Sequence, residues 1–126
     1  MITGRSSRRM VAAAALVLNA IKYLAGFPDD MPLISPNVLA TLQHLKKDIL
    51  HKEKSSLDLE EVLSALTISA TTNPSAQAAV DKLHLLSGCQ AHCTAILSSQ
   101  DDQVLKDLGI DATSDPEYSN NNLYYS

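Results

Sequence analysis

The sequence predicts a helix-rich α/β domain, a three-layer-like arrangement with a short and mostly parallel sheet. Two observations support this class: short apolar runs typical of strands alternate with helical patterns, and N-capping residues precede several of those patterns, at Ser35, Asp58 and Asn73. The chain has 126 residues, of which 45% are hydrophobic and 19% charged, so it is long enough for one domain with a core. We expect this domain to span residues 1–114 and a short tail to occupy 115–126.

The first element is predicted to be a strand over residues 2–4, followed by a glycine turn and a helix over about 8–25. Ser6 or Ser7 can cap this helix, and Gly26 is a typical helix stop. The helix is apolar on nearly every side, and such a helix is usually buried on more than one side. We therefore expect part of the surface that covers it to lie outside this chain.

The next segment, residues 31–34, is a short apolar run that predicts a strand. Ser35 and Pro36 then begin a second helix, as its N-cap and its first residue. Lys46 lies near the C-terminal end of this helix, where a cation suits the helix dipole. Residues at helical spacing predict the buried stripe of this helix: Val38, Leu42, Leu45 and Ile49.

Two further helices are predicted from their capping residues. Asp58 and Glu61 have the spacing of a capping box and open the third helix. Asn73 and Pro74 begin the fourth, and Gly88 ends it. Because only a short break separates these helices, they are expected to form an αα-hairpin.

Residues 88–97 predict a buried strand. A helix capped by Ser98 or Ser99 and ended by Gly109 should follow it, and then a last strand over 110–113. Strand alternation divides the side chains of residues 89–94 between two faces, with Cys89, Ala91 and Cys93 on one and Gln90, His92 and Thr94 on the other.

Charge and hydropathy exclude some classes of protein. The net charge of −4 argues against general binding to nucleic acid, and the apolar run over 11–18 is too short to span a membrane. Arg8 and Arg9 before this run resemble the start of a secretory signal, although Asn19 and Lys22 interrupt the apolar segment. Two cysteines at strand spacing do not make a disulfide framework, so a reducing, cytoplasmic setting is expected.

The turn after the first strand is a candidate anion or small-ligand site. A strand tip, hydroxyl groups and a helix N-terminus can together bind phosphate or carboxylate, and arginines add positive charge. The spacing of a P-loop is absent, and an ordinary capped helix with solvated arginines explains the same residues. The residues of this predicted site are Thr3, Gly4, Arg5, Ser6 and Ser7, with His92 as a further possible member.

Cys89, His92 and Cys93 form the other candidate cluster. Thiolates and an imidazole are zinc ligands, but a structural zinc site needs four ligands, and alternation places His92 opposite both cysteines. The same alternation disfavours a nucleophilic Cys–His pair. We therefore expect no metal, and we expect the cysteines to act as small core residues. No cofactor is indicated by the sequence.

The chain also resembles a known bacterial family, the C-terminal domain of the uncharacterised proteins called domain of unknown function 1846. The resemblance covers nearly the whole chain and depends on specific strings rather than on generic motifs. The most specific of these strings are Glu60-Glu61-Val62-Leu63, Ala70-Thr71-Thr72-Asn73-Pro74 and Gly88-Cys89-Gln90-Ala91-His92.

The resemblance implies that this chain corresponds to the C-terminal piece of a longer, cytoplasmic protein. It carries over no catalytic residue, because the activity of the family is not established. We therefore expect a structural role: packing against an N-terminal region and helping to form a homo-oligomer, without nucleic acid or membrane as partner. The alternative is part of an enzyme active site that an N-terminal region completes, with His92 or Cys89 contributing.

Overall fold

The computed structural model describes residues 2–114 and confirms an α/β domain rich in helix. The predicted tail at 115–126 lies outside the described residues. Along the chain the elements are β1 (Ile2–Gly4), α1 (Ala12–Ala25), α2 (Pro36–His44), η1 (Leu45–Ile49), α3 (Leu59–Ser69), α4 (Pro74–Asp81), η2 (Leu83–Leu86), β2 (Gln90–Cys93), α5 (Ser99–Asp107) and β3 (Asp111–Ser114).

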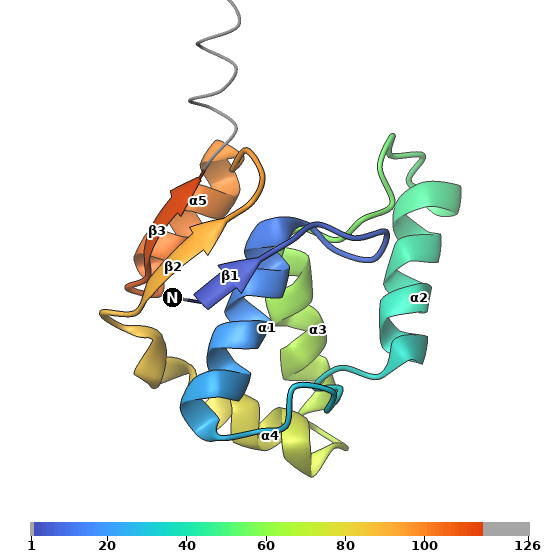
Figure 1. The fold of residues 1–126 in the computed structure, drawn as a ribbon. Coiled ribbons are helices and arrows are strands. Elements are labelled where there is room, and N and C mark those ends of the chain that lie inside the picture. The colour runs from blue at the N-terminus through green and yellow to red at the C-terminus, as the bar shows by residue number, and fades with distance from the viewer. Residues whose placement is uncertain (1, 115–126) are drawn as a thin grey trace, which may run out of the picture.

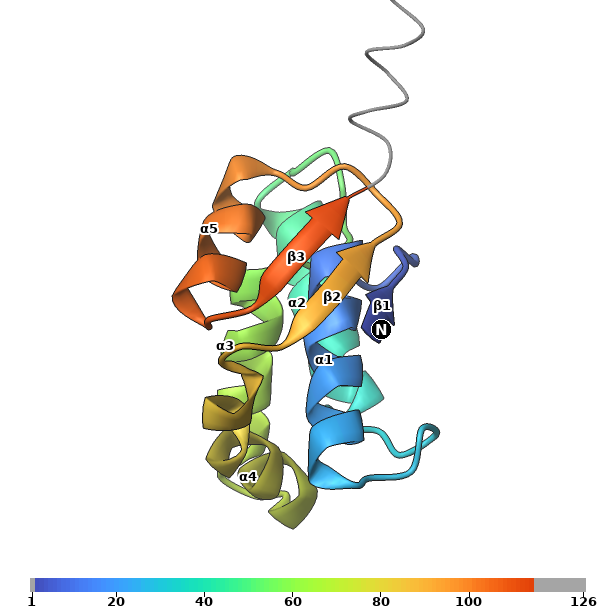
Figure 2. The ribbon, with the colours of Figure 1, turned by 60° about the vertical axis from the view of Figure 1, so that its left-hand side comes forward.

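The sheet among the described residues has three strands, all parallel, in the order β1–β2–β3 (Figure 1). Helix α1 packs against β1 and β2 on one face of the sheet, and α5 packs against β3 on the same side. Behind α1 lies α3, with α2 beyond it (Figures 1 and 2). The sheet, α1 with α5, and α3 therefore follow one another as successive layers.

Gly4 allows α1 to approach the sheet closely. A Cβ atom at this position would lie 2.4 Å from the carbonyl oxygen of Ala12 and 2.5 Å from Cβ of Leu16. Contacts this short do not occur in folded proteins, so any larger residue would push the strand away from the helix. Glycine at position 4 is thus required by packing.

Helix α1 is covered mainly by the domain itself. Most of its apolar side chains are fully buried between the sheet and α3, α4 and η2: Leu16, Val17, Ala20 and Ile21. Its last turn is different, because Tyr23 is 75% exposed and Leu24 is 37% exposed. The part of α1 that we expect a surface outside this chain to cover is therefore limited to the C-terminal end of the helix.

The start of α1 differs from the prediction. The helix begins at Ala12, and its N-cap, Val11, makes no side-chain capping bond. Ser7 instead accepts hydrogen bonds from the backbone N–H groups of Arg9 and Met10, so it stabilises a turn ahead of the helix. The backbone N–H of Val11 donates to the carbonyl oxygen of Leu57 (2.9 Å). Pairing with the segment before α3 thus replaces a serine cap.

The strand predicted at 31–34 is wrong. These residues form a bend in which Leu33 and Ile34 are buried. Pro32 cannot donate a ladder hydrogen bond, and Ser35 immediately caps α2, so no length remains for strand pairing. The apolar run is a buried loop, which periodicity alone does not distinguish from a buried strand.

The second helix keeps its predicted start but not its predicted buried stripe. After His44 the helix widens into the π-helical turn η1, and Leu39 is the only buried residue of α2 and η1. At the end of η1, Ile49 is 57% exposed and Leu50 is 55% exposed. The widened turn lets Lys46 bond to the Ser56 carbonyl oxygen and to Glu61 of α3.

The capping box at the start of α3 is confirmed, and Lys46 binds to it. Glu61 accepts from the Asp58 backbone N–H (2.9 Å) and from Nζ of Lys46 (2.7 Å). Burial acts to raise the pKa of Glu61, but these hydrogen bonds outweigh it and hold the pKa below its ordinary value. Burial raises the pKa of Asp58.

The fourth predicted helix is present in two pieces. Asn73 accepts from the Ser75 N–H and Pro74 is the first residue of α4, as predicted. The α-helix ends at Asp81, and the tighter turn η2 continues to Leu86. Gly88 has φ of +83°, which suits glycine, and the chain then enters β2.

Candidate functional site

The predicted site residues are distributed over three places in the fold. Thr3 and His92 lie on the outer face of the sheet, Gly4 is buried against α1, and Ser6 and Ser7 lie in a crevice beyond the strand ends. Arg5 is exposed and lines neither of the two hollows described below.

A row of polar side chains crosses the outer face of the sheet. Thr3, His92 and Thr113 are register partners on β1, β2 and β3, and Nδ1 of His92 lies 2.6 Å from Oγ1 of Thr113. Gln90 and Asp111 form the next pair on the same face. Among the described residues the helices lie on the opposite face, so this side of the sheet is polar and without a helical layer (Figure 2).

Cys93 lies on the inner side of β2, as alternation predicted, and Cys89 directly precedes the strand. Cys93 is fully buried, and burial together with the charge of Asp101 raises the pKa of its thiol to about 11. Cys89 is half-buried, and burial raises the pKa of its thiol. Both thiols are therefore protonated at neutral pH, which disfavours nucleophilic or metal-binding roles.

No group of three or more His, Cys, Asp or Glu side chains that could hold a metal ion occurs within residues 2–114. His92 points to the outer face of the sheet, whereas Cys93 points into the core. The Cys-x-x-His-Cys spacing thus does not bring its members together.

The crevice is a hollow of about 340 Å³ at the carboxyl ends of β1 and β2. Ser6, Ser7 and Lys54 line it together with the N-terminal turn of α1. Ligands of open α/β sheets commonly bind at this end of the strands, and the uncapped backbone N–H groups of α1 favour an anion.

Asp101 forms one wall of the crevice and opposes a bound anion. Its side chain is only 5% exposed, and Oδ1 accepts from the backbone N–H of Leu59 (3.2 Å) at the start of α3. The buried carboxylate already interacts with the partial positive charge at the N-terminal ends of the helices, so less of that charge is left for a bound anion. The anion site at Ser6 and Ser7 stays a prediction.

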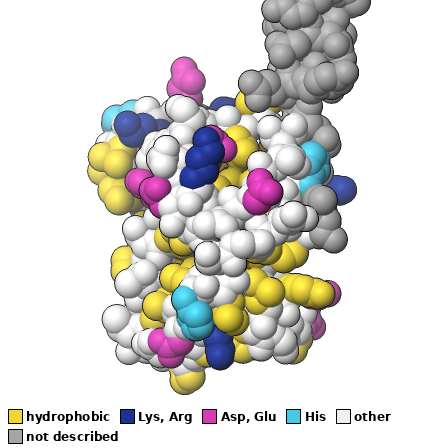
Figure 3. Space-filling model, turned by 90° about the vertical axis from the view of Figure 1, so that its left-hand side faces the viewer, with side chains coloured by type: hydrophobic (Ala, Val, Ile, Leu, Met, Phe, Trp, Pro, Cys, Tyr) yellow, Lys and Arg dark blue, Asp and Glu magenta, His cyan; other side chains and the backbone are white. Residues whose placement is uncertain are grey.

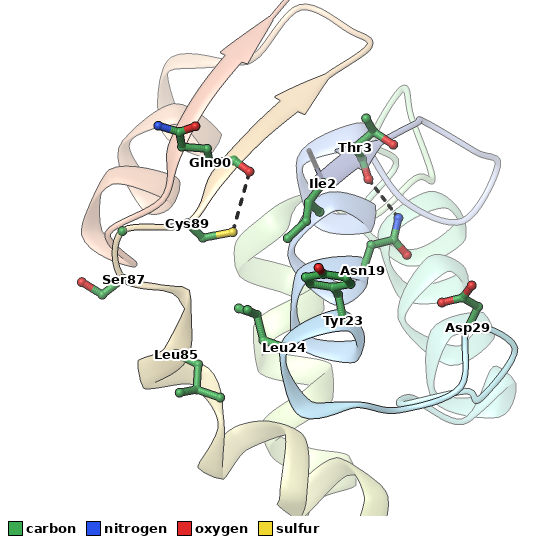
Figure 4. Close-up of a pocket in the computed structure, with 11 residues that line it drawn as sticks. Ile2, Thr3, Asn19, Tyr23, Leu24, Asp29, Leu85, Ser87, Cys89 and Gln90 are labelled. Atoms are coloured by element: carbon green, nitrogen blue, oxygen red, sulfur yellow. Dashed lines mark hydrogen bonds between the residues drawn. The ribbon is translucent and has the colours of Figure 1, made fainter.

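A larger hollow, which we call the α1 groove, was not predicted from the sequence. It measures about 870 Å³ and lies beside the last turns of α1, below the starts of β1 and β2 (Figure 4). Its apolar lining residues include Ile2, Tyr23, Leu24, Leu85 and Cys89. Figure 3 shows hydrophobic side chains gathered across the lower half of this side of the molecule, below the sheet. The all-round apolar character of the first helix was the signal for this surface.

None of the helices within 2–114 combines the length and the hydropathy that crossing a bilayer requires.

The fold and these surfaces define a helix-rich α/β domain with a bare sheet face and an apolar groove. The chain belongs to the family described as domain of unknown function DUF1846, C-terminal, whose model matches residues 1–124. This finding confirms the resemblance seen in the sequence.

Several longer bacterial proteins are similar to this chain. The UPF0371 protein of Clostridium botulinum (strain Eklund 17B / Type B) is 54% identical over 126 residues, which is 100% of this chain and 25% of that protein. The UPF0371 protein of Clostridioides difficile (strain 630) is likewise 54% identical with the same coverage, and that of Clostridium tetani (strain Massachusetts / E88) is 49% identical. The chain spans about a quarter of the length of the curated relatives it matches.

Proposed function

We propose that this domain is a structural unit that packs against the remaining region of a UPF0371-type polypeptide and supports its assembly. The observation that carries the proposal is the combination of coverage and surface. The whole chain aligns with a segment that makes up 25% of the length of the relative. It also presents apolar side chains at the α1 groove and at the end of η1.

The exposed apolar side chains supply the free energy for such packing. Tyr23 and Leu24 lie on α1, Leu85 is 38% exposed on η2, and Ile49 and Leu50 are more than half exposed. Full burial of a large apolar side chain contributes about 1.5–3 kcal/mol, so a few such contacts stabilise an interface. Parallel sheets are also normally covered on both faces, which favours a covering layer over the outer face of this one.

The assembled protein is proposed to be a cytoplasmic homo-oligomer. Both cysteines are free thiols, which suits a reducing compartment. A homo-oligomer would bury apolar surface that a single copy leaves exposed. Light scattering on the full-length protein measures the oligomeric state directly, and a monomeric mass would contradict this part of the proposal.

A second candidate function is a contribution to an active or ligand site that the remaining region completes. The crevice favours it, because Ser6, Ser7 and Lys54 lie at the carboxyl ends of the strands. Cys89 lines the α1 groove and His92 lies on the outer face, so each would serve a different site. With inorganic phosphate as probe, a rise in melting temperature that Lys54→Ala abolishes would support this function.

The structural proposal is tested by grafting. The chain replaces the matched quarter of the Clostridioides difficile relative, and this graft is compared with the same relative lacking that quarter. The graft should unfold in one transition, with the region before the junction more resistant to protease than in the truncated protein. Equal protease resistance in the two proteins would contradict the structural role.

A further inference from the structure

We propose that the α1 groove is the docking site for the segment of the longer polypeptide that directly precedes this domain. The inference depends on the proposed function and assigns a place to the contact. Its basis is the position of the groove: Ile2 and Thr3, the first residues of β1, line its rim.

The lining of the groove suits protein side chains. Tyr23, Leu24 and Leu85 present apolar surface at 75%, 37% and 38% exposure. Around them lie the neutral polar side chains of Asn19 and Gln90, and Figure 4 shows these residues around the hollow. An apolar centre with a polar rim is the usual composition of a protein–protein contact.

The location of the groove argues against a small ligand as its main occupant. The groove lies at the amino ends of β1 and β2, whereas α/β sheets bind ligands beyond the carboxyl ends of their strands. Asp29 is the only charged residue among the described residues that line the groove, so it offers little to orient a charged ligand.

The order of segments along the polypeptide indicates which segment occupies the groove. The matched family model is a C-terminal one, and the chain covers 25% of each relative compared above, so most of a relative precedes the matched part. The residues before β1 therefore approach the domain at the rim where Ile2 lies. A segment tethered this close has a high effective concentration at the groove, which favours it over an untethered partner.

The segment is expected to dock through its side chains and not as an added strand. The carbonyl oxygen of Gly4 accepts a hydrogen bond from the backbone N–H of Thr94. Because successive carbonyl groups of a strand point to opposite edges, the carbonyl group of Thr3 points to the other edge of β1. That carbonyl oxygen already accepts from Nδ2 of Asn19 (3.0 Å; Figure 4). An edge strand whose carbonyl is bonded in this way is a poor template for strand addition.

The test uses the full-length graft described above and hydrogen exchange of the segment before the junction. One variant carries Leu24→Ser with Leu85→Ser, and a second carries Tyr23→Ala alone. The control carries Ile68→Ser, which removes exposed apolar surface on α3, outside the groove lining. Since all of these side chains are more than a third exposed, the domain itself should stay folded, which circular dichroism checks.

In both groove variants the exchange rate of the preceding segment should rise by about tenfold or more, because local opening no longer has to break the groove contact. The α3 control should leave that rate unchanged. Unchanged exchange in both groove variants, in a graft that still protects the region before the junction, would overturn the docking site while leaving the structural proposal intact. Loss of protection in the unsubstituted graft would overturn the proposed function itself.

Discussion

The backbone N–H of Leu59 donates a hydrogen bond to the buried carboxylate of Asp101, across 42 residues of sequence. This bond joins the first turn of α5 to the first turn of α3. Asp101 therefore links two helices and also closes one wall of the crevice.

Replacement of Asp101 by Ala should destabilise the domain by about 1–3 kcal/mol, because the Leu59 N–H would stay buried without an acceptor. Asp101→Asn keeps an acceptor oxygen and should recover part of the loss. Asp102→Ala is the matched control: it removes an exposed pair with Lys106, worth at most about 1 kcal/mol. Urea denaturation measures all three, and equal losses at 101 and 102 would contradict the bridging role.

Gly4→Ala should destabilise the domain by about 3 kcal/mol or more, because its Cβ atom would overlap the backbone of α1. Gly26→Ala provides the comparison, since its φ is +75° but nothing lies within 4 Å of the added atom. That variant should lose only the backbone strain, about 1–2 kcal/mol. A larger loss at position 26 than at position 4, measured by thermal or urea unfolding, would refute the close approach of β1 and α1.

The Lys46–Glu61 contact should make stability depend on pH. Because the folded-state pKa of Glu61 is lowered from 4.5, its contribution is fully present above pH 4.5 and is lost as pH falls through the folded value. Asp58 acts in the opposite sense, because its pKa is raised from 3.8. Its contribution is fully present below pH 3.8 and is lost as pH rises through the folded value.

Glu61→Gln isolates the first of these effects. The variant should be less stable than the original chain at pH 7, by about 0.5–1 kcal/mol for a partly exposed pair. The difference should shrink as pH falls below 4.5. Urea denaturation at pH 7, 5 and 3 measures it, and a difference that is constant over this series would show that ionisation of Glu61 does not matter.

The two thiols should differ in their reaction with iodoacetamide. Cys93 is buried with a pKa of about 11, so at pH 8 only about one thiol in a thousand is ionised. Cys89 is half-buried and should be alkylated first. Intact-mass measurement should show one adduct on the folded chain and two in denaturant, and rapid double labelling without denaturant would contradict the burial of Cys93.

Local signals in the sequence predicted most of the helix starts. The capping box of Asp58 and Glu61, and Pro36 and Pro74 as first helical residues, act within one turn, so neighbouring residues suffice to predict them. Strand alternation around His92 was equally local, and it correctly separated His92 from Cys93.

The features that could not be predicted depend on distant partners. Ser7 does not cap α1, because Val11 pairs with the segment at Leu57. The π-turn η1 exposes Ile49 while Lys46 bonds to α3. Asp101 accepts from Leu59, which lies 42 residues earlier in the chain. The α1 groove is assembled from four separate segments of the chain, so the apolar character of the first helix signalled an exposed surface but not the groove itself.

The parallel pairing of β1 with β2 has a consequence for the order of folding. Gly4 accepts a hydrogen bond from Thr94, 90 residues further on, whereas β2 and β3 are joined through α5 alone. Closing the longer loop costs more chain entropy, so β2, α5 and β3 should pair first and β1 should join last. During synthesis the first strand thus has to wait, unpaired, until nearly the whole domain has left the ribosome.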